Sequence, residues 1–274
     1  MAHEQDIEDI EVRLLLEAIH ARYGFDLREY ALSSMRRRAR AALARSGLRH
    51  LGELQHRILR DPSSFPAVLE DLTVRVTEMF RDPSFYRVLC RRVLPVLRTY
   101  PLLKIWHGGC SSGEEAYASA ILLEEAGLYD RSQLYATDLN PAVLEQARQG
   151  VYSAERFEKF VDNYARCGGS SELSAYCTMA YDQVALRDAL KRNILFFQHD
   201  LVSDHVFGEM NVIFCRNVFI YFTPQLRERV LRKFAQSLCP GGFLCLGGGE
   251  RLPAVSDLPF SEFAREERIY RYEG

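Results

Sequence analysis

The segment 102–115 constrains the fold more than any other, because it reads LLKIWHGGCSSGEE, an apolar strand followed by a glycine-rich turn and the acidic start of a helix. A second strand pattern ends at Asp138, 23 residues after Glu115. In an open α/β sheet such a turn admits an adenosine-containing ligand, and an acid at the next strand end accepts hydrogen bonds from ribose hydroxyls. The segment therefore predicts a Rossmann-like sheet that binds a nucleoside cofactor.

The turn differs from the dinucleotide-binding fingerprint, because Gly108, Gly109 and Gly113 do not follow the spacing G-x-G-x-x-G. Two carboxylates, Glu114 and Glu115, open the helix. They would repel a pyrophosphate at the helix start and attract a cation. S-adenosylmethionine carries an ammonium and a sulfonium but no phosphate. The pattern thus favours a methyltransferase cofactor over NAD, and an ordinary α/β turn with helix-favouring acids is the alternative.

The composition predicts a globular protein, because 274 residues with 47% hydrophobic content can form one large or two ordinary domains. No apolar run approaches the roughly 20 residues that cross a bilayer, and the first residues are polar, so we expect a cytoplasmic protein without membrane insertion. The seven cysteines form no C-x-x-C pair. We interpret them as buried, reduced thiols and expect no metal site.

Residues 28–60 hold nine arginines against two acids, Glu29 and Glu53, which gives a local charge of +7. Guanidinium groups bind carboxylates and phosphates through paired hydrogen bonds, so this segment predicts a surface for an acidic partner. A solvated helix face and a nucleic-acid surface are alternatives. The net charge of -2 and the pI of about 6.4 disfavour nucleic acid.

The periodicity of apolar residues divides the chain into two parts. Helical spacing predicts an all-α domain over residues 1–97, with helices at 7–22, 32–45, 50–60, 64–76 and 83–97. Strands and helices then alternate, which predicts a mostly parallel sheet covered on both faces over residues 98–274. The expected strands are 102–107, 133–138, 193–197, 210–215 and 242–247, and the expected helices are 113–126, 141–149 and 224–238. Residues 268–272 alternate as an antiparallel edge strand would, and 152–192 is a small insert with a weak signal.

Three polar residues lie at or directly after the carboxyl ends of predicted strands, where ligands of open α/β sheets bind. Asp138 suits the ribose hydroxyls, and the alternative, a helix N-cap, fits Asn140 better because Pro141 follows it. Arg216 and Asn217 come directly after the apolar strand 210–215. A buried arginine needs a partner, which could be an acid at the sheet edge, the cofactor or a substrate carboxylate.

Four blocks occur along the chain in a fixed order. They are VTEMFRDP at 76–83, GCSSGEEAY at 109–117, ATDLN at 136–140 and FCRNVFIYF at 214–222. Together they resemble the chemotaxis receptor glutamate methyltransferases, the CheR family, over essentially the whole chain. The resemblance implies an α/β protein in which a small all-α N-terminal domain precedes a Rossmann-like, S-adenosylmethionine-dependent methyltransferase domain. Its implied activity is methylation of glutamate side chains on a methyl-accepting chemoreceptor. A non-catalytic sensor or scaffold that binds S-adenosylmethionine or S-adenosylhomocysteine, and a nucleic-acid methyltransferase, are the alternatives.

The resemblance also implies roles for individual residues. The residues implied to bind the cofactor are Thr77, Arg81, Glu115, Asp138, Leu139, Asp200, Leu201, Arg216 and Asn217. Those implied to act in catalysis are Arg81, Arg216 and Tyr221, and those implied to bind the receptor are Arg36, Arg38, Arg40 and Arg45. The implied partner is the helical bundle of the receptor. We expect no pentapeptide tether, because residues 164–192 lack a clear glycine-bearing β-insert. Arg75 and Asp200 depart from the family, in which asparagine is usual at both positions.

Overall fold

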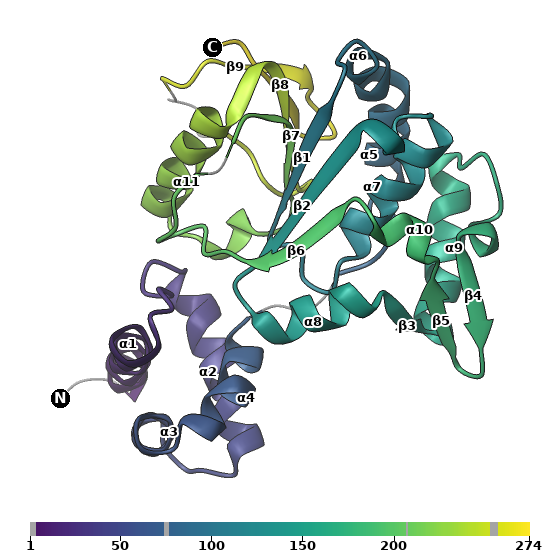
Figure 1. The fold of residues 1–274 in the computed structure, drawn as a ribbon. Helices are drawn as coiled ribbons and strands as arrows, with labels where there is room; N and C mark the ends of the chain where they lie inside the picture. The colour runs from purple at the N-terminus through teal and green to yellow at the C-terminus, as the bar shows by residue number, and fades with distance from the viewer. Residues whose placement is uncertain (1–3, 74–76, 207, 253–256) are drawn as a thin grey trace. The chain divides into compact units, whose positions relative to one another are not determined.

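The structure is a computed structural model that describes residues 4–73, 77–206, 208–252 and 257–274 (Figure 1). The chain folds as two compact units. The first comprises Met1–Arg75, Asp200–Asp204 and Tyr221–Val230, and the second comprises Val76–His199, His205–Ile220 and Leu231–Gly274. The predicted division at residue 97 therefore falls within the second unit. Arg75 lies outside the described residues.

The first unit is helical. Its N-terminal elements are α1 (Glu4–Tyr23), α2 (Leu32–Ser46), α3 (Leu51–Arg60), the 3-10 turn η1 (Pro62–Ser64) and α4 (Phe65–Leu72). Val12, Leu15 and Ile19 of α1 are fully buried at helical spacing, as the sequence pattern predicts. Asp61 caps η1 by accepting the Ser63 N–H. These elements confirm the helices that were expected within residues 7–60, whereas the helix expected over 64–76 ends at Leu72 in α4.

The second unit contains a seven-stranded sheet of order β6-β2-β1-β7-β8-β10-β9. Its strands are β1 (Leu103–Gly108), β2 (Ser132–Asp138), β6 (Ile194–Gln198), β7 (Met210–Cys215), β8 (Leu238–Leu246), β9 (Phe260–Ala264) and β10 (Ile269–Tyr272). The first five strands in this order pair in parallel, which confirms the predicted sheet. β10 is antiparallel to both β8 and β9, so the expected edge strand lies one position inside the edge, which β9 forms.

The register of the parallel strands brings their carboxyl ends together. Ile105 of β1 lies opposite Leu134 on one side and Val212 on the other. β2 then ends at Asp138 and β7 ends at Cys215. The loops that follow β1, β2 and β7 therefore emerge along one edge of the sheet.

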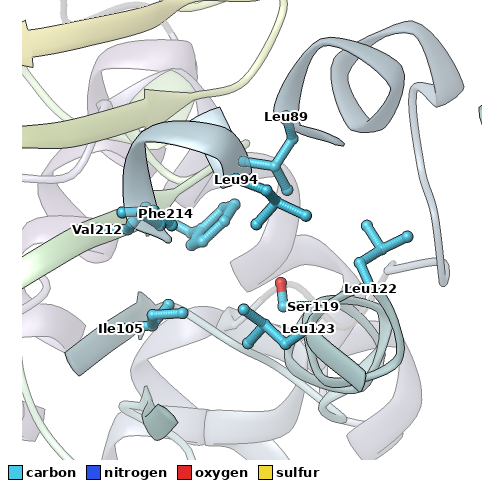
Figure 2. Close-up of a pocket in the computed structure, with 9 residues that line it drawn as sticks. Leu89, Leu94, Ile105, Ser119, Leu122, Leu123, Val212 and Phe214 are labelled. Carbon is cyan, nitrogen blue, oxygen red and sulfur yellow. The ribbon is translucent and has the colours of Figure 1, made fainter. Parts of the chain in front are cut away.

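Helices cover both faces of this sheet (Figure 1). On one face lie α5 (Pro83–Val88), the π-helical segment η2 (Leu89–Val93), α6 (Leu94–Leu97) and α7 (Glu114–Glu125). Figure 2 shows the apolar pocket between these helices and the sheet, lined by Leu89, Ile105 and Phe214 among others. On the opposite face, Trp106 packs against Phe234 of α11 (Pro224–Ser237) with ring centroids 5.2 Å apart. Next to β2 and β6 lies α8 (Pro141–Gln149), capped by Asn140 as predicted.

The weak-signal segment 152–192 holds a second, three-stranded antiparallel sheet of order β3-β5-β4. Its elements are β3 (Val151–Ser153), α9 (Ala154–Cys167), η4 (Leu173–Tyr176), β4 (Cys177–Ala180), β5 (Gln183–Leu186) and α10 (Asp188–Lys191). The interpretation that this segment lacks a clear β-insert was wrong about its fold. Strands of three or four residues are too short for a period-two signal. The turn between β4 and β5 uses Tyr181 at φ 55°, without a glycine.

No helix among the described residues is long and apolar enough to cross a membrane. All seven cysteines are free. Within the described ranges, histidine, cysteine and acidic side chains form no group of three or more that could hold a metal ion.

Candidate functional site

The turn after β1 passes very close to the loop after β7. Gly109 has φ +77°, and a Cβ atom there would lie 2.6 Å from Val218 Cγ2, so only glycine fits this position. The N–H groups of Gly109 and Cys110 both donate to the Thr137 carbonyl at 2.8 Å. The turn is therefore fixed against the end of β2, directly beside Asp138.

Asp138 is half-buried at the tip of β2 and closes this turn. Its carboxylate accepts the Ser111 N–H at 2.8 Å and the Asn140 N–H at 3.0 Å. Burial raises the pKa of the Asp138 carboxyl, although the backbone N–H groups oppose the shift. A carboxylate has about four acceptor positions, so acceptor capacity remains for a ligand. The neighbouring Leu139 is also half-buried, and its carbonyl accepts Gln198 Nε2 at 3.2 Å.

Glu115, in the first turn of α7, has a partner on each carboxylate oxygen. His107 Nδ1 donates to Oε1 at 3.1 Å, and Arg216 Nη1 donates to Oε2 at 3.2 Å. Burial alone would raise the pKa of the Glu115 carboxyl, but the His107 hydrogen bond and the Arg216 charge outweigh it and hold this pKa below its ordinary value. Glu115 is therefore a fixed anion at the carboxyl edge of the sheet.

Arg216 lies at the centre of the side-chain network, with 3% of its side chain exposed. Besides Glu115 it contacts Asp82 at 2.9 Å and the Arg81 carbonyl at 3.3 Å, both through Nη2. Its guanidinium lies 4.0 Å from the centroid of the Phe85 ring. The two carboxylates raise the pKa of Arg216 against the effect of burial. Of the three partners considered for a buried arginine, the structure shows acids at the sheet edge, Glu115 and Asp82.

Asn217 follows Arg216 in a left-handed conformation, with φ 63°. The buried carboxylate of Glu250 fixes this loop by accepting three backbone N–H groups, from Asn217 at 3.0 Å, Ile220 at 3.1 Å and Gly247 at 2.6 Å. Burial raises the pKa of Glu250, opposed by these same N–H groups. After Asp138 and Glu115, Glu250 is the third acid at this edge of the sheet, and it fixes the loop from which the Arg216 and Asn217 side chains extend.

Family models match the chain in two consecutive segments. Residues 10–73 match the CheR methyltransferase all-alpha domain, and residues 75–267 match the CheR methyltransferase SAM binding domain. The chain belongs to the CheR methyltransferase family. The family boundary at residues 73–75 agrees with the boundary between the compact units and not with the one predicted at residue 97.

Curated relatives match almost from end to end. Cher3 of Pseudomonas putida KT2440 is 43% identical over 265 residues, which cover 96% of this chain and 97% of that protein. A protein of Listeria innocua named chemotaxis protein methyltransferase is 31% identical, over 85% of this chain and 87% of its own. Chemotaxis protein methyltransferase 1 of Vibrio cholerae is 30% identical, over 92% of each chain. This CheR-family chain therefore matches these relatives over most of its own length and most of theirs.

The cofactor of the CheR family's α/β domain is S-adenosylmethionine, and the residues at the carboxyl edge of the sheet fit it. The pocket candidates are carboxylates, Asp138 and Glu115, which suit ribose hydroxyls and an ammonium group and disfavour a phosphate. The orphan Nε2 of His107 and Nε of Arg216 are buried and have no hydrogen-bond partner among the described residues. These two atoms leave hydrogen-bonding capacity for water or ligand beside Glu115.

Thr77 and Arg81 lie on the irregular segment that precedes α5. The Thr77 carbonyl accepts Arg156 Nη2 at 3.0 Å, and the Arg81 carbonyl accepts Arg216 Nη2. Both residues are half-buried. The structure therefore brings the Arg81 backbone to the Arg216–Glu115 network and ties Thr77 to α9.

Glu114 does not have the role that the sequence pattern suggested. It is fully buried, pairs with Arg156 of α9, and accepts Ser112 Oγ at 2.9 Å. Burial raises the pKa of the Glu114 carboxyl, and Arg156 opposes that shift. Of the two acids that open α7, only Glu115 contacts Arg216. The charge of Glu114 is balanced inside the protein by Arg156.

Three of the residues predicted to bind the cofactor or act in catalysis belong to the first unit: Asp200, Leu201 and Tyr221. Asp200 is buried and accepts the Val202 N–H at 2.8 Å, while its own N–H donates to Asp204 Oδ2 at 2.8 Å. Burial raises the pKa of Asp200. Leu201 is 8% exposed. Their assignment to the adenine, and that of Tyr221 to the acceptor, remain predictions.

The arginines of α2 are mostly paired within the first unit. Arg36 contacts Asp9 at 2.8 Å, Arg40 makes two hydrogen bonds to Glu8, and Arg45 contacts Asp71 at 2.9 Å. Arg38 is 6% exposed, donates to the Leu72 carbonyl at 2.7 Å, and lies 4.2 Å from the Tyr221 ring centroid. The charge of +7 counted within 28–60 is therefore reduced by acids of α1 and α4, outside that window.

Sequence reasoning did not identify His107, Asp82, Arg156 or Glu250. His107 is fully buried and stacks on Phe214, with centroids 4.5 Å apart. A histidine on a buried strand gives no sign of its partner, and the partners of the other three lie far away in sequence. The one available signal was the need of a buried Arg216 for acidic partners.

Proposed function

We propose that the chain transfers the methyl group of S-adenosylmethionine to glutamate side chains of a methyl-accepting chemoreceptor, which gives methyl esters for adaptation of a chemosensory pathway. Relatives named as chemotaxis protein methyltransferases support the pathway. The observation that carries the acceptor class is Arg216, a nearly buried guanidinium beside Glu115 that suits a carboxylate entering the pocket.

In this proposal each acid at the sheet edge has its own task. Glu115, ionised because its pKa is lowered, holds the ammonium group of the cofactor, and Asp138 accepts the ribose hydroxyls. Thr77 and Arg81 contact the methionine end, Leu139 lies beside the ribose contact, and Asp200 and Leu201 contact the adenine.

The reaction needs an ionised acceptor in a site that excludes water. The bound cofactor supplies an electrophilic methyl group on a cationic sulfur, so the acceptor oxygen forms the C–O bond while the C–S electron pair stays on the sulfur. Arg216 and Arg81 favour the ionised acceptor by lowering its pKa. Asn217 orients the pocket wall, and Tyr221 contacts the acceptor. Alignment of this kind can lower the activation free energy of the transfer by on the order of 7–11 kcal/mol.

The α2 arginines supply the docking surface for the receptor's helical bundle. Arg40 is 64% exposed, so acids of a receptor can compete with Glu8 for it. Arg45, which is 48% exposed, can exchange its partner in the same way. Arg36 is less exposed and lies on the same helix, and Arg38 acts through Tyr221, whose ring it contacts. Docking of this type weakens as salt rises. The expectation of no pentapeptide tether is kept in this proposal on its remaining ground, the absence of a glycine from the turn between β4 and β5.

A transfer assay tests the acceptor class. The protein is incubated with methyl-labelled S-adenosylmethionine and a cytoplasmic fragment of a chemoreceptor, with a second fragment whose candidate glutamates are glutamine as the control. We expect label on the first fragment only, released by mild alkali as methyl esters are. Alkali-stable label, label on nucleic acid, or no label on any receptor fragment of the source cell would contradict the proposal.

A further inference from the structure

The segment 77–82 adopts backbone conformations that need support from neighbouring residues. Phe80 and Asp82 both adopt left-handed conformations, at φ 55° and φ 60°, which non-glycine residues rarely occupy. Residues 77–82 lie outside any helix or strand. Conformations of this kind persist where the surroundings impose them.

One face of α9 supplies the groups that hold this segment. Arg156, Lys159 and Asn163 follow one another at helical spacing and so lie on the same side of the helix. Arg156 Nη2 donates to the Thr77 carbonyl at 3.0 Å, and Asn163 Nδ2 donates to the Met79 carbonyl at 3.2 Å. Lys159 pairs with the Glu78 side chain at 2.5 Å. Side-chain donors thus replace the backbone donors that a strand would provide.

Arg156 differs from the other two residues because its guanidinium has a second partner. The same Nη2 contacts Glu114, the first residue of α7 and the neighbour of Glu115. The guanidinium also lies 5.6 Å from the Tyr152 ring centroid. A single side chain therefore joins the Thr77 backbone to the start of the helix that carries Glu115.

We propose that Arg156 is a positioning residue for the cofactor: it sets the distance between the Thr77 backbone and the helix start that carries Glu115, whereas the Arg81 backbone is held by Arg216. The inference rests on the proposed function, which assigns Thr77 and Glu115 to S-adenosylmethionine. Arg156 itself contacts none of the reacting atoms. Its effect is on cofactor affinity and not on the chemical step.

Titration calorimetry with S-adenosylhomocysteine tests this role. Loss of one charge-assisted hydrogen bond corresponds to about a tenfold change in affinity, so we expect Arg156→Ala to weaken binding by about tenfold or more. Arg156→Lys keeps a charge and a donor and should recover part of the loss. The matched control is Lys159→Ala on the same helix face, whose ion pair is 62% exposed on the lysine side; we expect it to stay within about twofold. KM for S-adenosylmethionine should rise with Arg156→Ala, while kcat at saturating cofactor changes little.

A double variant separates positioning from simple neutralisation of Glu114. Arg156→Ala leaves the buried Glu114 carboxylate unpaired and can lower stability for that reason alone. Combining it with Glu114→Gln removes the charge, so we expect thermal stability to recover while the affinity for S-adenosylhomocysteine stays low. Recovery of affinity in the double variant, or an unchanged affinity in Arg156→Ala, would overturn the inference. A parent protein that does not bind S-adenosylhomocysteine would instead overturn the proposed function on which the inference rests.

Discussion

Replacement of Arg216 by alanine should lower stability and cofactor affinity together. The side chain is 3% exposed and its partner Glu115 is 16% exposed, so the variant leaves a largely buried carboxylate with His107 alone. Breaking such a pair costs about 3–5 kcal/mol. The Asp82 side chain is 49% exposed, so its pair with Arg216 adds less than about 1 kcal/mol.

These magnitudes give a measurable result for a protein that still folds. A loss of about 4 kcal/mol lies below the usual free energy of unfolding, about 5–15 kcal/mol, and should lower Tm by roughly 8–16 °C. Thermal unfolding and calorimetric titration with S-adenosylhomocysteine measure the two effects on the same sample. The matched control is Arg91→Ala, because Arg91 is exposed and its loss should change stability by less than about 0.5 kcal/mol.

The double variant Arg216→Ala/Glu115→Gln identifies the source of the destabilisation. Removing the unpaired charge should restore part of the Tm, whereas cofactor binding should remain impaired because both candidate ligands are gone. A Tm within about 2 °C of the parent for Arg216→Ala would refute the electrostatic reasoning. An unchanged affinity for S-adenosylhomocysteine would remove Arg216 from the cofactor site.

Three further predictions concern single buried groups. Glu250→Gln should lower the free energy of unfolding by about 2–4 kcal/mol in denaturant titrations, because an amide cannot accept the three N–H groups that the carboxylate accepts; an unchanged midpoint would contradict this. Ser119→Ala should raise the free energy of unfolding by about 1 kcal/mol, because the Ser119 hydroxyl lies buried among apolar side chains (Figure 2) and has no hydrogen-bond partner in the part of the chain that the structure describes; a lower Tm would be the opposite result. The lowered pKa of Glu115 implies stability that is present above its unfolded value of 4.5 and lost as pH falls through the folded value. The stability difference between the parent and Glu115→Gln should therefore be constant above about pH 5 and shrink below it, and a difference that grows with acid would be contrary to the assignment.

The parallel part of the main sheet could be predicted because each of its strands carries its own signal, whereas the edge strand β9 was not predicted. The buried run 210–215 and the capped helix after Asn140 are local patterns, and the parallel order follows from their alternation. The helix 83–97 was also predicted, but not its place in the second unit, because periodicity shows that a face is apolar and not what covers it. The small sheet β3-β5-β4 was missed because each strand is only three or four residues long.

For the candidate site, sequence identified the groups and structure identified their partners. Glu115, Asp138 and Arg216 stand at strand ends or at a helix start, positions that a pattern can locate. Their environment depends on long-range pairs: Glu115 and Arg216 are 101 residues apart, and Arg216 and Asp82 are 134 apart. The same limit explains why the pattern assigned Glu114 to a cation site, since its partner Arg156 is distant in sequence. It also explains why the α2 arginines looked unpaired, since the acids that pair with them lie on α1 and α4.

The carboxyl edge of the main sheet is assigned here as the cofactor site, and a crystal structure with S-adenosylhomocysteine tests that assignment most directly. We predict that the ribose hydroxyls lie within hydrogen-bond distance of the Asp138 carboxylate and that the amino group contacts Glu115. A ligand bound elsewhere on the protein, or one at this edge without contact to either carboxylate, would contradict the account.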